Sequence, residues 1–287
     1  MRALRAIRRE AHRCPTAAHC PSGKSSRPVA SKGLGMPLIA FEQVALTLGG
    51  KLILTGIDVA IEKGEFLSVV GPSGCGKTSL LNLAAGLLMP SKGRVTYEDK
   101  PVTGPRQDIA IVFQDYGKAL LPWRTAAGNI SLALEAINYP RGRRETRIAE
   151  LLDLIGLSNH AEKFPNQLSG GMQQRLQIAR CLAQDPAVLL MDEPFGALDA
   201  MTRQALQDEV LAIAARTGAT VLFITHDLEE AIYLGDRVIA MRPNPGRFEV
   251  SFPIDLPRPR DQLATRERPD FLHLRRELFD VIKGSEH

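Results

Sequence analysis

The chain has 287 residues, of which 44% are hydrophobic, 24% charged and 5% aromatic, with a formal net charge of +4. This length and apolar content suffice for one large domain or two small ones, and they exclude disordered, collagen-like and disulfide-scaffold proteins. No window offers the roughly 18 uncharged apolar residues of a membrane-spanning helix. The four cysteines are too scattered for a disulfide framework, so we expect a reducing compartment.

The positive charge is concentrated at the start of the chain. The chain has 36 basic and 32 acidic residues, and residues 1–35 hold eight of the basic residues and one of the acidic ones. The other 252 residues therefore hold 28 basic and 31 acidic residues, a net charge of −3. Residues 1–36 show no sustained apolar period and are predicted to form a basic, disordered extension. Met36 opens the first well-patterned segment and is a candidate translation start. Because the patterned part is acidic, we expect no nucleic-acid partner.

The next segments alternate between strand and helix patterns. Three predicted strands cover residues 39–46, 57–61 and 66–70; the glycine pair at 49–50 separates the first two, and the third is a short apolar run. A glycine-rich turn follows the third strand. After it, leucines recur at helical spacing up to residue 87, and Pro90 closes the helix.

The second half of the chain continues this alternation. Residues 118–183, approximately, have helical patterning and weak strand signals, so we expect an α-helical insertion. Two buried-strand runs follow at 188–191 and 221–224, and the helical pattern between them stops at Gly218. Strands separated by helices predict a mainly parallel sheet with helices on both faces. A last segment, 271–282, is expected to form an amphipathic helix that packs against the body.

The glycine-rich turn matches the phosphate-binding pattern G-x-x-x-x-G-K-[ST] at every fixed position. Its glycines allow backbone N–H groups to surround a phosphate, and the helix that follows presents its positive end. Lys77 is predicted to reach the β- and γ-phosphates, and the Thr78 hydroxyl is predicted to bind Mg²⁺. The candidate nucleotide contacts in this turn are Gly71, Pro72, Ser73, Gly74, Cys75, Gly76, Lys77, Thr78 and Ser79.

Polar side chains follow three further predicted strands, where the carboxyl ends of a parallel sheet bind ligands. Asp192 and Glu193 end one strand: Asp192 is a candidate Mg²⁺ ligand, and Glu193 is a candidate base for the attacking water. His226 ends another and is a candidate γ-phosphate contact. Gln114 follows the run 109–113 and is a candidate ligand of both Mg²⁺ and nucleotide, although a surface glutamine after a strand is also common.

A second potential phosphate site begins another helix. Ser169, Gly170 and Gly171 directly precede a helical stretch, where a serine hydroxyl, backbone N–H groups and the helix dipole favour an anion. An ordinary capped helix is the alternative. Because the first phosphate site already has its own loop, this second one is predicted to act on the nucleotide of another copy of the chain.

Together these motifs resemble those of the ATP-binding cassette (ABC) ATPases, and the resemblance covers residues 37 to about 245. It implies an α/β fold: a P-loop NTPase (RecA-like) core with an antiparallel β accessory sheet and an inserted α-helical subdomain. The implied ATPase domain spans 37–250, with the helical subdomain at about 118–183, and 251–287 form a tail. The resemblance also implies that Asp199, together with Ser169, Gly170 and Gly171, contacts the nucleotide bound to the second copy of the chain. Its implied catalytic residues are Glu193, His226 and Lys77.

Finer features are similar to the taurine, nitrate and sulfonate importer ATPases. These are the segment from Leu120 to Trp123, the run 170–175 and the run 191–200. The resemblance implies a subunit at the cytoplasmic face of the inner membrane that binds ATP and Mg²⁺. Its implied partners are transmembrane permease subunits, a second copy in a head-to-tail dimer and, indirectly, a substrate-binding protein. The alternative is a soluble ABC-type ATPase acting on DNA or ribosomes.

Two positions left alternatives open. Trp123 either packs in the core or lies near the groove that receives a membrane subunit. The aromatic residue that stacks on adenine in this family is replaced by Leu48, so adenine stacking is either weaker or supplied from elsewhere, with Phe41 and Tyr97 as candidates.

Overall fold

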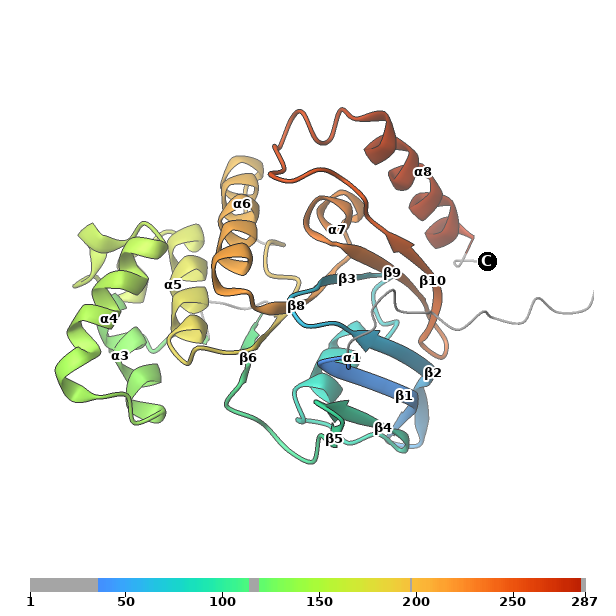
Figure 1. The fold of residues 1–287 in the computed structure, drawn as a ribbon, viewed down its shortest axis with the longest axis horizontal. Coiled ribbons are helices and arrows are strands. Elements are labelled where there is room, and N and C mark those ends of the chain that lie inside the picture. The colour runs from blue at the N-terminus through green and yellow to red at the C-terminus, as the bar shows by residue number, and fades with distance from the viewer. Residues whose placement is uncertain (1–35, 114–118, 197, 285–287) are drawn as a thin grey trace, which may run out of the picture.

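The structure is a computed structural model that describes residues 36–113, 119–196 and 198–284. Within these residues the strands form two sheets that lie side by side (Figure 1). The larger sheet has the order β10-β9-β3-β8-β7-β6, and all its neighbouring strands are parallel except β10 and β9. Its strands are β3 (Phe66–Val70), β6 (Ile109–Val112), β7 (Val188–Asp192), β8 (Thr220–Thr225), β9 (Arg237–Arg242) and β10 (Arg247–Pro253).

The smaller sheet is antiparallel and has the order β2-β1-β4-β5. Its strands are β1 (Ile39–Leu48), β2 (Lys51–Ile61), β4 (Lys92–Tyr97) and β5 (Lys100–Pro101). The β1–β2 turn is formed by Gly49 and Gly50, both with positive φ, as a two-residue hairpin turn requires. A mainly parallel core sheet with an antiparallel accessory sheet confirms the fold class expected from the sequence.

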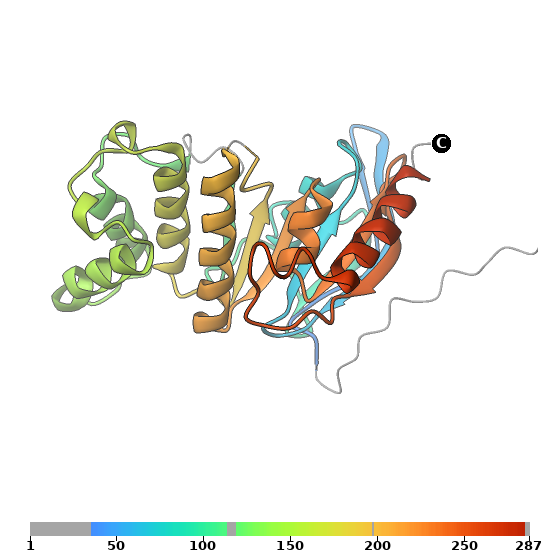
Figure 2. The same ribbon diagram turned by 90° about the horizontal axis from the view of Figure 1, so that it is seen from above.

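Seven α-helices of the described residues cover or extend these sheets. They are α1 (Lys77–Ala84), α3 (Ala126–Ala136), α4 (Arg141–Leu154), α5 (Gly170–Leu182), α6 (Ala200–Thr217), α7 (Leu228–Leu234) and α8 (Pro269–Lys283). Helices α3 to α5 lie between β6 and β7 in the chain and extend to one side of the larger sheet in both views (Figures 1 and 2). Short 3₁₀ turns at Ser158–His160 and Pro165–Gln167 connect α4 to α5.

The core has two parts because each strand of the larger sheet alternates its side chains between two covered faces. Phe66 and Val70 of β3 pack with residues of α3 to α8, whereas Leu67 and Val69 pack with α1 and the smaller sheet. Both faces of the strand are buried, and this explains why four of its five residues, all except Ser68, are apolar.

Several elements differ from the sequence expectation, among them β2, which begins at Lys51 rather than at residue 57, and β4 and β5, which were not expected. Helix α1 ends at Ala84 rather than near residue 87, since Gly86 adopts φ +71° and a Cβ there would lie 2.2 Å from the Gly104 carbonyl oxygen. Strands β9 and β10 were not expected at all, and β10 crosses the boundary placed at residue 250.

The segment after β10 packs against α6 and α7. Phe271 and Leu278 of α8 are buried in the same cluster as the core of the larger sheet. Arg266 and Arg275 both pair with Glu229 of α7, at 2.9 and 2.8 Å between guanidinium nitrogen and carboxylate oxygen. None of the described helices is long and apolar enough to cross a membrane.

Candidate functional site

The phosphate-binding loop connects β3 to α1. Gly76 caps α1 with φ +98°, and a Cβ at this position would lie 2.5 Å from Leu54 Cδ2, so only glycine fits there. A pocket of about 390 Å³ lies beside the loop, within the range of small-molecule sites. It is lined by Ile53, Ser73, Gly74, Gly76, Lys77, Thr78, Ser79, Asp192 and Glu193.

Three predicted loop contacts, Gly71, Pro72 and Cys75, do not line the pocket. The Cys75 side chain is buried, and burial raises the pKa of its thiol. Gly71 packs against β9, because a Cβ there would lie 2.8 Å from the Met241 carbonyl oxygen. Gly71 and Cys75 shape the loop from its inner side.

Lys77 is buried and its ammonium group curls back over the loop. Its Nζ donates to the carbonyl oxygens of Gly71 (2.8 Å) and Pro72 (3.2 Å) and lies 3.6 Å from Glu193 Oε1. The lysine charge therefore lies between the loop and the end of β7, where a phosphate group entering the pocket would meet it.

Glu193 occupies a backbone conformation that is rare for a residue with a side chain. Its φ is +43°, and its N–H donates to the Ile224 carbonyl of β8 at 2.9 Å. Strain of this kind persists where the surroundings enforce it, and it is concentrated at functional sites. The turn places the carboxylate between two cationic or polar partners, with Oε1 near Lys77 and Oε2 3.0 Å from His226 Nδ1.

His226 follows β8, directly beside β7 in the sheet, so the two strand ends bring it to Glu193. Its side chain is largely exposed, which leaves the ring accessible to a ligand. A second, small cavity of about 40 Å³ adjoins both residues. The sequence indicated each residue separately, but their mutual contact depends on the pairing of β7 with β8 and was not foreseen.

A divalent cation would find hard oxygen ligands in the pocket. The Thr78 hydroxyl hydrogen-bonds to Asp192, and both residues line the pocket. Burial raises the pKa of Asp192, while Thr78 and the nearby Lys77 act in the opposite direction. No cluster of three or more His, Cys, Asp or Glu side chains suited to a metal is found among the described residues. Mg²⁺ commonly takes one or two protein ligands together with phosphate oxygens, so this donor pair fits it.

The residues expected to act in trans lie elsewhere. Ser169 caps α5, accepting from Met172 N at 3.3 Å, and Asp199 caps α6, accepting from Thr202 N at 3.0 Å. Both are exposed, and neither they nor Gly170 and Gly171 line the phosphate pocket. Gly171 also has a packing role, since a Cβ would lie 2.5 Å from Thr202 Cγ2 of α6. Gln114 lies outside the described residues.

The structure bears on both alternatives left open by the sequence. Phe41 and Tyr97 are both buried in the core beneath the smaller sheet, so neither is available to stack on a base. Leu48 is 42% exposed at the end of β1. Trp123 is 71% exposed, so core packing was the wrong interpretation.

Comparison with known proteins identifies the family of this chain. Residues 54–196 match the family model described as ABC transporter. A putative ATP-binding protein of Brucella abortus (strain 2308) is 46% identical over 246 residues, which cover 86% of this chain and 94% of the relative. The nitrate import ATP-binding protein NrtC of Synechococcus elongatus is 46% identical over 239 residues, covering 82% of this chain and 36% of that protein.

Solved structures show the same fold. A dimeric ATP-binding cassette in a post-hydrolysis state, bound to ADP and Pi, is 32% identical with a TM-score of 0.64, covering 75% of this chain and 98% of the other. CbiO1 of Clostridium perfringens, part of the ABC transporter complex cbiONQ, is 25% identical with a TM-score of 0.72, covering 88% and 100%. The chain therefore belongs to the ABC transporter family, in which it is a nucleotide-binding subunit that hydrolyses ATP.

Proposed function

We propose that this chain powers an importer of a small oxyanion or sulfonate, such as nitrate, bicarbonate, taurine or an alkyl sulfonate. The observation that carries the proposal is the 46% identity with a nitrate import ATP-binding protein, extending over 82% of this chain. A bicarbonate transport ATP-binding protein of Synechococcus elongatus is 44% identical over 79% of the chain. Nitrate, bicarbonate and sulfonates are all small oxyanions, so these relatives support one chemical class of cargo.

Two copies would form each complete ATP site. The phosphate loop and the end of β7 would bind the nucleotide from one side, while Ser169 is exposed at the start of α5 and does not line that pocket. In a head-to-tail dimer, the α5 N-terminus of one copy would face the γ-phosphate held by Lys77 of the other, with Asp199 beside it. Closure then follows from the higher affinity of ATP for the closed dimer.

Hydrolysis would proceed by attack of a water oxygen on the γ-phosphorus, with loss of the bond to the ADP oxygen. Glu193 accepts the proton of that water, and His226, held against Glu193 at 3.0 Å, contacts the γ-phosphate. Lys77 offsets the charge that develops on the phosphoryl oxygens. Thr78, Asp192 and Gln114 would hold Mg²⁺, which supplies further charge neutralisation when bound.

The exposed Trp123 supports a docking surface for a membrane subunit. Its loop is held in place by Asn129 of α3, whose side chain is buried and bonds the N–H and carbonyl of Leu121 and the carbonyls of Arg124 and Thr125. A large aromatic residue on a rigid loop is typical of an interface anchor. With this surface docked on a permease, the chain would lie peripherally at the cytoplasmic face of the inner membrane.

Replacing Trp123 with alanine is expected to lower anion uptake and substrate-stimulated ATPase activity of the reconstituted transporter by about 10-fold, as loss of an interface anchor does. The ATPase activity of the isolated cassette should stay unchanged. Leu263→Ala is the matched control, because Leu263 is also 71% exposed but lies in the segment before α8. Equal uptake by both variants would contradict the docking surface.

Leu48→Tyr is expected to tighten ATP binding by about 5-fold or more, since an aromatic ring stacked on a base contributes roughly 1–3 kcal/mol. The proposal is that Leu48 gives the adenine only an aliphatic contact. Titration with a fluorescent ATP analogue measures the change. Leu52→Tyr serves as the control: Leu52 is similarly exposed but pairs with Thr47, whereas Leu48 pairs with Lys51, so the two leucines face opposite sides of the hairpin. Tighter binding in both variants would place the base elsewhere.

Co-purification of the tagged chain with hydrophobic permease subunits tests the importer function itself. Proteoliposomes that contain ATP, with the cassettes facing the lumen, are then tested for uptake of labelled nitrate, bicarbonate and taurine. The compound that is taken up identifies the cargo. A chain that instead purifies with DNA or ribosomes, and has no membrane partner, would support the soluble ABC-type ATPase and overturn the proposal.

A further inference from the structure

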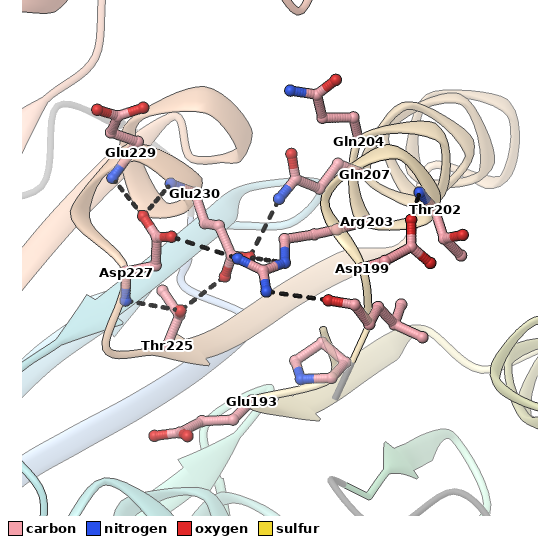
Figure 3. Close-up of polar contacts among 12 residues, drawn as sticks. Glu193, Asp199, Thr202, Arg203, Gln204, Gln207, Thr225, Asp227, Glu229 and Glu230 are labelled. Atoms are coloured by element: carbon pink, nitrogen blue, oxygen red, sulfur yellow. Dashed lines mark hydrogen bonds and ion pairs between the residues drawn. The ribbon is translucent and has the colours of Figure 1, made fainter. Parts of the chain in front are cut away.

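A cluster of polar side chains lies beside the Glu193–His226 pair, between the N-terminal ends of α6 and α7. Figure 3 shows Arg203 extending from α6 toward Asp227 and Glu230. We call Arg203, Thr225, Asp227 and Glu230 the Arg203 cluster. The sequence motifs assigned no function to any of its members.

Arg203 contacts two segments that are separate in the chain. Its Nη2 donates to the Leu198 carbonyl oxygen at 3.1 Å, in the loop just before α6. Its Nη1 lies 3.9 Å from Asp227 Oδ2, and its Nε lies 3.8 Å from Glu230 Oε1. The planar guanidinium can join such partners because its donors point in several fixed directions.

Glu230 anchors the acidic side of the cluster. It is buried, and burial raises the pKa of its carboxyl group, while a hydrogen bond from the Thr225 hydroxyl at 2.7 Å opposes the rise. Gln207 of α6 donates to the other carboxylate oxygen at 3.2 Å. An ionised carboxylate with this little solvent needs a counter-charge, which Arg203 supplies.

Asp227 connects the cluster to the switch histidine. It directly follows His226 and caps α7, accepting from the N–H groups of Glu229 (2.9 Å) and Glu230 (3.1 Å). The position of Asp227 therefore determines where α7 begins and where the preceding His226 lies. Glu193, Arg203, His226 and Asp227 also line the same small cavity.

The loop on the other side of Arg203 leads to the dimer-facing residue. Leu198, whose carbonyl accepts from Arg203, directly precedes Asp199, the exposed cap of α6. A displacement of this loop would shift the Leu198 carbonyl oxygen that accepts from Arg203. The Arg203 guanidinium would then move relative to Asp227. The nitrogen Nε of Arg203 is buried and has no hydrogen-bond partner among the described residues, so its contact with Glu230 is ionic alone.

We propose that Arg203 is a positioning residue that links the loop carrying Asp199 to the segment carrying His226, so that contact of a second copy with Asp199 stabilises the existing contact of His226 with Glu193. The inference rests on the functions proposed above for Asp199, Glu193 and His226. Arg203 itself contacts neither nucleotide nor water, and its effect is on the rate of hydrolysis rather than on ATP binding by a single chain.

Arg203→Lys tests this link because lysine keeps the positive charge near Glu230 but lacks the planar set of donors. We expect kcat to fall about 10-fold or more, as a small misplacement of a catalytic group does, while the ATP dissociation constant of the monomer and the melting temperature stay at the wild-type values. Arg216→Lys, at the exposed far end of the same helix, is the matched control and should hydrolyse ATP normally. A variant whose stability, binding and rate decline together would show a merely structural function.

A double-mutant cycle with Asp227→Asn distinguishes a link from two independent effects. Asparagine caps a helix as well as aspartate does, so α7 should keep its N-terminus while the charge facing Arg203 is lost. If the two residues act together, Arg203→Lys combined with Asp227→Asn will be no slower than the slower single variant. Rate losses that multiply would overturn the proposal.

The same assays separate this inference from the proposed catalytic residues. If Glu193→Gln and His226→Ala hydrolyse ATP normally, the catalytic assignment fails. If both are impaired while Arg203→Lys has wild-type kcat, that assignment stands and only the function of Arg203 is rejected.

Discussion

Glu193→Gln is expected to lower kcat for ATP hydrolysis by about 100-fold or more, because a general base contributes typically 10² to 10⁴ to the rate. Glutamine has the shape of glutamate and can still contact His226, but it cannot accept the proton of the attacking water. ATP binding and dimer closure should persist, so the dimer accumulates with ATP bound. Single-turnover assays measure the rate of hydrolysis, and size-exclusion chromatography in the presence of ATP measures the accumulation of the dimer.

The structure offers a charge-matched control for this variant. Glu145 lies exposed on α4 in the helical insertion, away from the pocket lining, so Glu145→Gln should turn over at the wild-type rate. Normal hydrolysis by Glu193→Gln would remove Glu193 from the chemistry. Its position between Lys77 and His226 would then have to be explained as structural.

Ser169→Arg is expected to abolish ATPase activity while the monomer binds ATP as before. The arginine would place bulk and charge at the α5 N-terminus, where the γ-phosphate of the second copy is proposed to bind. Ser169 also caps α5, and loss of such a cap costs about 1 kcal/mol, so the melting temperature must be recorded. Ser158→Arg adds the same side chain at an exposed position of the helical insertion and should remain active.

Mixing two inactive variants provides a sharper test of the shared site. In a dimer of Ser169→Arg with Lys77→Ala, one site combines the intact Lys77 of the first chain with the intact Ser169 of the second. The other site carries both defects. Head-to-tail geometry therefore predicts that the mixture recovers part of the activity that each variant lacks alone. A mixture as inactive as its components would reject the composite site.

Local sequence patterns were sufficient for much of the fold. Short, mainly apolar runs predicted β3, β7 and β8, since a strand covered on both faces has few polar residues. Gly218 predicted the end of α6, where it adopts φ +66°. β9 and β10 were not assigned, although β9 is an interior strand of the sheet: unlike the runs of β7 and β8, the apolar run of β9 has an arginine directly at each end.

The candidate site was predictable to the extent that its chemistry is local. The phosphate loop is one continuous segment, and Asp192, Glu193 and His226 each follow a strand, so a parallel sheet brings them to one edge. The contact of Glu193 with His226 joins residues 33 positions apart and depends on the register of β7 with β8. Neither distance nor orientation follows from the two motifs taken separately.

The sequence by itself determined the class of this protein: phosphate loop, acidic strand end, histidine and serine-glycine helix start occur in a definite order, and each motif carries its chemistry in a few adjacent residues. The tertiary structure decided which side chains are available. It buries Phe41 and Tyr97, exposes Trp123, and brings Arg203 between Leu198 and Asp227. These outcomes depend on packing between segments distant in the chain, and burial is a property of the assembled fold rather than of any residue type.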